Sequence, residues 1–286
     1  MKHEVLQMLK CIDENPRKVK LMISILEKST ISALGKQKFG RKRMNLEYCI
    51  AGIMYYLRTN CGWRRIPKVF GNYKTIYGWY VKISKIRVFS RSFGSLIKWM
   101  KKQRIVSLKR LIIDGSLITT NNGGKLAKRN PRNHNKNTIN RIVVSNGKGM
   151  PIYIGLAPGT RHDTNLLKPA LNYIAKVYRL PKKFYMHGDK GFDSFDNRMA
   201  ISKRGGTALI PVRNHGFIAP YIKGKDSRRW VIERTNAWFN RFKVMDNSFI
   251  RNMDRLFECC NLAGLLILSR FISSPKLKKL IGILEC

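Results

Sequence analysis

The order of extended and helical patterns after about residue 107 constrains the fold of this chain most strongly. Before that point apolar residues recur at helical spacing, and beyond it short apolar runs alternate with helical segments. The expected elements are a strand at 111–113, a hairpin at 139–145 and 151–157, a helix at 164–178, a strand at 183–187, a helix at 197–204, a strand at 208–212 and a helix at 228–242. This order predicts an α/β fold, a mixed sheet with helices packed on its faces.

The first 106 residues predict a small all-helical domain. Asn15-Pro16 separates the first two helical segments, and Asn45 is placed to cap a helix that runs to about Leu57. Short helices with Gly and Pro turns follow, which is typical of a helix-turn-helix-like module. We therefore expect two domains, 1–106 and 107–286. The apolar segment 256–272 should form a helix that completes the core.

Positive charge dominates the composition. The chain has 57 Lys and Arg against 16 Asp and Glu, a net charge of +41. Such a charge opposes compaction unless a polyanion neutralises it. Nucleic acid is the first candidate, because each phosphate contact releases counterions. An anionic membrane ranks second, since the sequence shows neither a basic amphipathic helix with a clean apolar face nor a lipidation motif.

The basic residues concentrate where acids are missing. From Tyr48 to Ile113 there are 15 Lys or Arg, among them Arg64 and Arg65, and no Asp or Glu. Ordinary solvated surfaces mix both signs, so we expect this region to lie against nucleic acid. The preceding basic loop, 36–43, contains Arg41 and Arg43. It is either a phosphate-contacting arm or a solvated linker, and both interpretations stay open.

Targeting and redox patterns indicate an intracellular protein. The start of the chain lacks the apolar core of a signal peptide, and the run 262–268 is far shorter than the roughly 20 residues of a membrane span. The six cysteines show no CxxC spacing, so we expect reduced thiols and neither a zinc site nor disulfides. We expect a cytoplasmic location.

Three acidic residues are placed to converge. Asp114 is the only acid between Glu47 and Asp163, and it follows a buried strand. Asp189 also follows a strand, and Glu233 lies on a helix that should flank the same sheet. Each alone has a simpler interpretation: Asp114 and Asp189 as turn residues, Glu233 as part of a solvated helix face. Together they predict one crevice lined by three carboxylates.

Such a cluster needs cations, because unneutralised carboxylates repel each other and their pKa values rise. Hard oxygen ligands suit Mg²⁺, with Mn²⁺ as a substitute. Two ions about 4 Å apart can activate an attacking oxygen and stabilise a leaving one.

The remaining polar residues have structural interpretations. Asp163 is expected to cap a helix, with a minor role near the metal as the alternative. Asp193 and Asp196 are expected to cap the helix that follows them, and His134 and His187 to be structural or on the DNA side. The segment 115–137 is rich in Gly, Asn and Lys, and is either a flexible loop over the site or a disordered insert.

The helix that carries Glu233 should have one apolar stripe and one polar face. Val231, Trp238, Phe242 and Met245 follow helical spacing and define the predicted stripe. Glu233 falls on the opposite side, stacked with Arg229, Ala237 and Asn240.

Several motifs point to one family. They are Trp63-x-x-Ile66-Pro67-x-x-Phe70-Gly71, Ile113-Asp114-Gly115-Ser116, Gly159-Thr160-Arg161-His162-Asp163-Thr164, Gly188-Asp189-Lys190-Gly191-Phe192-Asp193 and Arg229-Trp230-Val231-Ile232-Glu233-Arg234-Thr235-x-x-Trp238-x-x-Arg241-Phe242. Over about residues 36–271 the chain resembles the DDE transposases of bacterial insertion sequences, most closely insertion-sequence family five. It departs from relatives with a Tyr-x-x-Arg-x-x-x-Glu-x-x-x-x-x-x-Lys signature, having Asp226 for Tyr and Asn240 for Lys.

The resemblance implies a ribonuclease-H-like catalytic fold, Mg²⁺, and DNA cutting followed by strand transfer. Asp114, Asp189 and Glu233 would be the catalytic residues and hold two ions. Arg229 and Arg241, one helical turn either side of Glu233, would steady phosphates, and Lys190 would join the DNA contacts. The partners would be double-stranded DNA of the terminal inverted repeats and target DNA, bound by a homodimer. A nuclease on the same fold and a catalytically silent DNA-binding protein derived from a mobile element are the alternatives.

Overall fold

The computed structural model describes residues 3–35, 45–212 and 229–283. It divides into two compact units: a first unit, Met1–Leu96 with Asn240–Cys286, and a second unit, Ile97–Phe239. The compact units therefore differ from the predicted division at residue 106, because the C-terminal segment packs with the N-terminal helices. As a division by function, 1–106 and 107–286 stays a prediction.

The first unit is built almost entirely of helices, as expected for the N-terminal region. Its elements are α1 (His3–Leu9), α2 (Pro16–Leu34), α3 (Leu46–Thr59), the 3-10 turns η1 (Trp63–Arg65) and η2 (Lys68–Phe70), α4 (Tyr73–Lys85), the start of α5 (Val88–Lys102), η5 (Lys243–Met245), β7 (Asn247–Ser248), α9 (Met253–Ser269) and α10 (Ser274–Ile283). The Asn45 side chain accepts a hydrogen bond from the Glu47 backbone N–H, which confirms the predicted cap of α3. Asn15 caps α2 in the same way.

The helix α9 forms the centre of the first unit. Every position from Leu256 to Ser269 except Phe257 is buried, and most of these residues are apolar or small. The helix packs against α2, α3 and α4. A helix that is buried nearly all round belongs in an interior, so this segment completes a core, as predicted.

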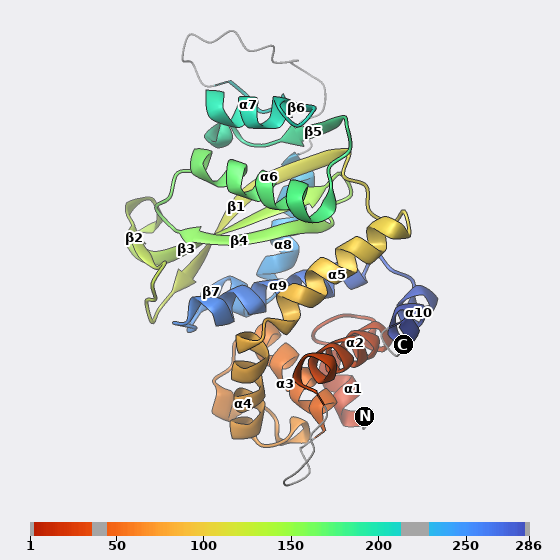
Figure 1. Cartoon of the computed structure of the whole chain (residues 1–286). Coiled ribbons are helices and arrows are strands. Elements are labelled where there is room, and N and C mark those ends of the chain that lie inside the picture. The colour runs from red at the N-terminus through yellow and green to blue at the C-terminus, as the bar shows by residue number, and fades with distance from the viewer. Residues whose placement is uncertain (1–2, 36–44, 213–228, 284–286) are drawn as a thin grey trace. The chain divides into compact units, whose positions relative to one another are not determined.

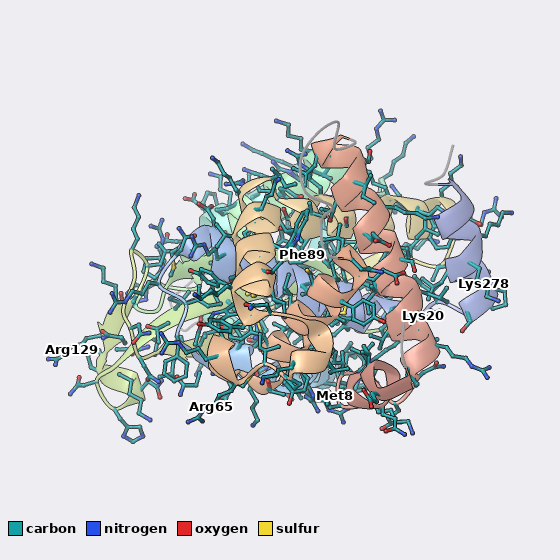
Figure 2. All side chains as sticks on the ribbon, turned by 90° about the horizontal axis from the view of Figure 1, so that it is seen from below. Met8, Lys20, Arg65, Phe89, Arg129 and Lys278 are labelled. Atoms are coloured by element: carbon teal, nitrogen blue, oxygen red, sulfur yellow. The ribbon has the colours of Figure 1, made fainter. Side chains whose placement is uncertain are left out.

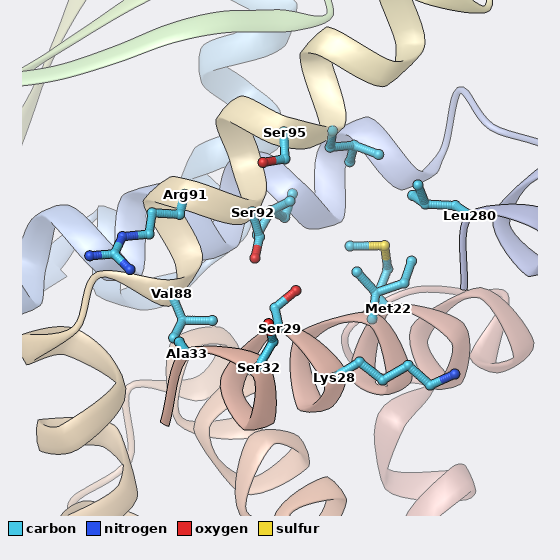
Figure 3. A pocket seen from close by; sticks show the side chains of 13 residues that line it. Met22, Lys28, Ser29, Ser32, Ala33, Val88, Arg91, Ser92, Ser95 and Leu280 are labelled. Carbon is cyan, nitrogen blue, oxygen red and sulfur yellow. The ribbon is translucent and has the colours of Figure 1, made fainter. Parts of the chain in front are cut away.

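A hollow remains between α2 and α5 of this unit (Figure 3). Its volume is about 320 Å³, and much of its lining consists of small side chains: Ser29, Ser32, Ala33, Ser92 and Ser95. Its lining residues include Lys28 and Arg91 but no acid, so this hollow cannot supply the carboxylate chemistry that the sequence predicts.

The second unit contains the predicted mixed sheet. Its strands are β1 (Arg110–Thr120), β2 (Lys128–Asn130), β3 (Lys136–Asn146), β4 (Pro151–Pro158), β5 (Phe184–His187) and β6 (Gly206–Leu209). The strand order is β2-β3-β1-β5-β6, with β4 also paired to β3. The first pairings are antiparallel, whereas β5 runs parallel to both β1 and β6. The α/β class and the mixed sheet are confirmed, and the arrangement agrees with a ribonuclease-H-like domain.

The first strand is longer than predicted, which corrects the expected loop at 115–137. Residues up to Thr119 pair with β3, where Thr138 is the partner of Thr119. Ile118 and the following threonines are β-branched and favour extended backbone, and they outweigh the turn tendency of Asp-Gly. Position 115 of this strand favours glycine, because the Cβ of any other residue would lie only 2.7 Å from Asn140 Oδ1.

Helices cover both sides of the sheet (Figure 1): α6 (Thr164–Tyr178) lies on one side and α8 (Arg229–Asn240) on the other. The helix α6 has the predicted bounds. The helix α7 (Phe195–Ser202) and strand β6 each begin two residues earlier than expected. Ser194 caps α7 and Asp193 instead pairs with Arg198 at 2.7 Å, so the predicted caps at Asp193 and Asp196 were wrong.

The buried stripe of α8 also differs from the prediction. Val231, Ile232, Thr235, Asn236 and Phe239 are buried, whereas Trp238 is only half-buried. Phe242 and Met245 are buried but follow the end of the helix at Asn240, so helical spacing does not apply to them. Arg229, Glu233, Ala237 and Asn240 are all exposed, and the predicted polar face is confirmed.

No helix within the described ranges is long and apolar enough to span a membrane. The cysteines in those ranges, Cys11, Cys49, Cys61, Cys259 and Cys260, form no disulfide, and three of them are buried.

Candidate functional site

The pairing of β1 with β5 brings two of the predicted acids together. The last parallel pair joins Ile112 to His187, and Asp114 and Asp189 each follow two residues later. Because neighbouring strands lie about 4.8 Å apart, the two aspartates lie side by side, each two residues beyond this pair. We expected Asp114 to end its strand. It instead lies inside β1, just beyond the last residue that pairs with β5.

Arg229 connects the second aspartate to the glutamate. Its Nη2 lies 3.4 Å from Asp189 Oδ2 and 3.7 Å from Glu233 Oε1, one turn further along α8. The three side chains are 37–59% exposed, so solvent or a ligand can reach the pairs. The charge of Arg229 also acts on Asp114 and opposes the rise of its pKa. Arg229 therefore pairs with Asp189 and Glu233, and its charge also reaches Asp114.

Asp114 is the least solvated of the three. Burial raises the pKa of its carboxyl to about 6, against hydrogen bonds from the Gly115 backbone and the Asn236 side chain that lower it. The charge of Asp163 raises it further. A carboxylate with a raised pKa is one whose negative charge the surrounding protein compensates incompletely.

Asp163 lies closer to this site than its predicted role implies. It occupies the N-cap position of α6, but its side chain makes no capping hydrogen bond. Its Oδ2 is 3.0 Å from the point where a Cβ on Gly191 would lie, and Asn140 Nδ2 donates to its Oδ1 at 3.5 Å. The Asp189 turn therefore packs against Asp163, and the predicted cap is confirmed in its position but not in its side-chain hydrogen bond.

Two further buried residues at this site were not predicted from the sequence. Asn236 donates a hydrogen bond to Asp114, and Arg141 on β3 donates to Asn236. A polar residue in a buried helix stripe, one turn after Glu233, was the available indication for Asn236. Arg141 gave no indication, because its proximity depends on the pairing of β3 with β1.

The acids fit a divalent cation by charge. Asp114, Asp189, Glu233 and the nearby Asp163 carry more negative charge than Arg229 neutralises, and carboxylate oxygens are hard ligands. In the described part of the chain no group of three or more His, Cys, Asp or Glu side chains is close enough to form a complete metal site. Arg229 is the counter-charge that stands between two of the acids in this structure.

The predicted DNA-contacting residues lie on exposed surfaces. Arg64 and Arg65 are exposed in η1, and Lys190 is exposed in the turn η4 (Lys190–Phe192) after Asp189. Figure 2 shows Arg65, Arg129 and Lys278 extending outward. Arg41 and Arg43 lie outside the described residues.

Arg241 differs from its predicted position. It follows the end of α8, two helical turns beyond Glu233, and belongs to the first unit. There it lines a cavity of about 610 Å³ together with the cations Lys10, Lys18, Arg58 and Arg270. The expectation that it lies one helical turn from Glu233 was wrong. The prediction that it contacts DNA stays a prediction.

The two histidines singled out in the sequence differ in exposure. His187 is buried at the end of β5, and His134 is exposed shortly after β2. Their expected roles as structural or DNA-side residues stay predictions.

Comparisons with known proteins identify the family of the chain. Residues 107–267 match the family model described as "Transposase DDE domain", and residues 26–93 match the one described as "Putative transposase of IS4/5 family (DUF4096)". A relative from Burkholderia cepacia, "Putative transposase for insertion sequence element IS402", is 26% identical over 180 residues, which cover 58% of this chain and 81% of the relative. Asp114, Asp189 and Glu233 all fall within the first match, and the chain belongs to the DDE transposases of the IS4/5 family.

Proposed function

We propose that the chain binds the ends of its own insertion sequence, cuts a DNA strand there and joins the freed end to target DNA. The supporting observations are that Asp114 and Asp189 follow adjacent paired residues of β1 and β5, and that Arg229 pairs with both Asp189 and Glu233. Their excess negative charge would repel DNA phosphates unless cations are bound, so the reaction should require Mg²⁺.

Asp114, Asp189 and Glu233 would hold the ions, most simply two. Bound Mg²⁺ would lower the energy of the attacking and leaving oxygens of the phosphodiester. The role of the protein is to place the acids, to restrain the DNA and to supply fixed positive charge. Asp114 has the most fixed position, because it is part of a paired strand and accepts a hydrogen bond from a buried side chain.

Arg229 is suited to change partners in this reaction. Without DNA it neutralises Asp189 and Glu233, and once those acids bind cations it is available to phosphate oxygens. A guanidinium on the rigid helix α8 then stabilises negative charge as it develops on the phosphate. Lys190, next to Asp189, would add a second positive charge at the same place.

Remote cations would position the DNA. Arg64, Arg65 and Arg241, with Arg41 and Arg43 outside the described residues, would contact backbone phosphates. Each such contact removed should lower the slope of log affinity against log salt by about 0.9. Because the substrate is chromosomal, we expect the protein in the cytoplasm with the nucleoid, and pairing of two DNA ends would require at least a dimer.

The test is an end-joining assay with the full chain. A duplex that carries the inverted repeats flanking the reading frame is incubated with a supercoiled target plasmid, with and without Mg²⁺. We expect a nick or cut at the repeat tip and joined products that need Mg²⁺. Cutting without joining would indicate a nuclease, and salt-sensitive binding without cutting under any divalent ion would indicate a silent DNA-binding protein.

A further inference from the structure

The contacts beneath α8 form a chain of three polar side chains that ends at Asp114. Asn236 Nδ2 donates to Asp114 Oδ2 at 2.9 Å, and Arg141 Nη2 donates to Asn236 Oδ1 at 3.4 Å. Asn236 is 7% exposed and Arg141 is 0% exposed. Burial of polar groups at this depth is costly unless their hydrogen bonds serve the structure or the site.

The sheet register explains why these residues meet. Asp114 is paired with Val143 and Ser116 with Arg141, so Asp114 and Arg141 are diagonal neighbours on one face of the β1–β3 ladder. The helix α8 covers that face and inserts Asn236 between them. Phe239, one turn further along α8, packs its ring 4.7 Å from the Arg141 guanidinium and holds it in place.

Arg141 determines which way the Asn236 amide points. A guanidinium only donates hydrogen bonds, so the amide oxygen must face it. The amide nitrogen is then directed toward Asp114, whose carboxylate only accepts. The reversed amide would place two donors together at Arg141 and two acceptors together at Asp114. The orientation is therefore imposed by both neighbours.

This arrangement differs from the contact that Arg229 makes. Arg229 pairs directly with Asp189 and Glu233 and is half-exposed, so it is a counter-charge that can leave. Arg141 is buried and acts through a neutral amide. A neutral donor restrains the Asp114 carboxylate about its Cβ–Cγ bond without competing for its full negative charge.

We propose that Asn236 is a positioning residue for Asp114 and that Arg141 fixes the orientation of Asn236. The two residues keep the carboxylate ready to bind a divalent cation, and this inference rests on the proposed metal-dependent function. Loss of a hydrogen-bonding partner behind a metal ligand typically weakens metal binding by about 10- to 100-fold.

The test measures Mn²⁺ binding to the full chain by electron paramagnetic resonance of the free ion, alongside DNA cleavage. Asn236→Ala should weaken Mn²⁺ binding by about tenfold or more. The Mn²⁺ concentration that gives half-maximal cleavage should rise by the same factor. The KM for DNA at saturating Mn²⁺ should stay unchanged. Arg141→Met should act in the same direction, and Arg141→Lys, which keeps a donor and a charge, should lie closer to the unaltered protein.

Thr235→Val is the matched control. Thr235 is buried beside Asn236, and its hydroxyl lies within hydrogen-bond distance of two backbone carbonyls, those of Gly149 and Val231, and donates its one proton to this pair of acceptors. This change should lower stability and leave Mn²⁺ binding unaltered. The positioning role of Asn236, but not the proposed function, would be overturned by either of two results. These are unaltered Mn²⁺ binding in Asn236→Ala, or a loss of Mn²⁺ binding in Thr235→Val as large as in Asn236→Ala. Failure of the unaltered chain to bind Mn²⁺ would overturn the proposed function as well.

Discussion

The buried acid Glu258 should make the stability of the first unit depend on pH. It is 0% exposed on α9, and its Oε2 accepts from the Phe89 backbone N–H at 2.8 Å, with Ser90 N–H at 3.3 Å. It thus caps the N-terminus of α5 from a different helix. Burial raises the pKa of Glu258 from 4.5 to about 7, although these hydrogen bonds lower it.

The sign of the effect follows from proton binding. Between pH 4.5 and about 7 the folded protein holds a proton on Glu258 that the unfolded chain has lost. Stability from this group is therefore complete below pH 4.5 and is lost as pH rises through about 7. The rise in pKa corresponds to a loss of about 3 kcal/mol in the free energy of unfolding.

Glu258→Gln removes this dependence, because the amide carbonyl can still accept from Phe89 N–H but never ionises. The assay is urea unfolding of both proteins at a series of pH values from about 4.5 to 8, which spans the shifted pKa. The free energy of unfolding of the variant minus that of the unaltered protein should increase by about 3 kcal/mol as the pH rises across that range. Glu14→Gln, the same change at an exposed acid, should give a nearly constant difference. A pH-independent difference for Glu258→Gln, or one that falls with pH, would refute the reasoning.

Two further changes test the site and the fold. Arg229→Ala removes the counter-charge of Asp189 and Glu233, so Mn²⁺ should bind more tightly while cleavage at saturating metal slows by about tenfold or more; equal cleavage rates would argue against a phosphate contact. Gly205→Ala should lower the free energy of unfolding by more than the roughly 1–2 kcal/mol that a positive φ costs, because its Cβ would collide with the Lys182 carbonyl oxygen. Gly123→Ala has a similar φ and no atom within 4 Å, so in urea unfolding it should cost only the strain.

Much of the fold was predictable because local and tertiary preferences agree. Asn45 caps α3, α6 has its predicted bounds, and the succession of strands and helices follows the alternating patterns. Asp114 shows where a local rule failed: Asp-Gly usually ends a strand, but here the β-branched residues after it continue the ladder. Trp238 shows another failure, because helical spacing from Val231 placed it in the buried stripe, whereas the helix buries Phe239 and leaves Trp238 half-buried.

The sequence allowed a prediction of the acids of the candidate site, but not of the residues that hydrogen-bond behind them. The scarcity of acids, together with their positions after two strands and on a flanking helix, led to the prediction of Asp114, Asp189 and Glu233 without any knowledge of their contacts. The roles of Asn236 and Arg141 depend on the register of β1 with β3 and on the rotation of α8, which no sequence spacing specifies. The packing of residues 240–286 with the first unit was equally invisible, because it depends on which apolar faces meet.

The most direct measurement is single-turnover cleavage of a duplex that carries the terminal repeat, in Mg²⁺, by the unaltered chain and by Glu233→Gln. Asp196→Asn, at an exposed acid of the same unit, serves as the control. We predict cleavage at the repeat tip by the unaltered chain and the control, and none by Glu233→Gln, which should still bind the duplex. Cleavage by Glu233→Gln at the unaltered rate would contradict the assignment of this site.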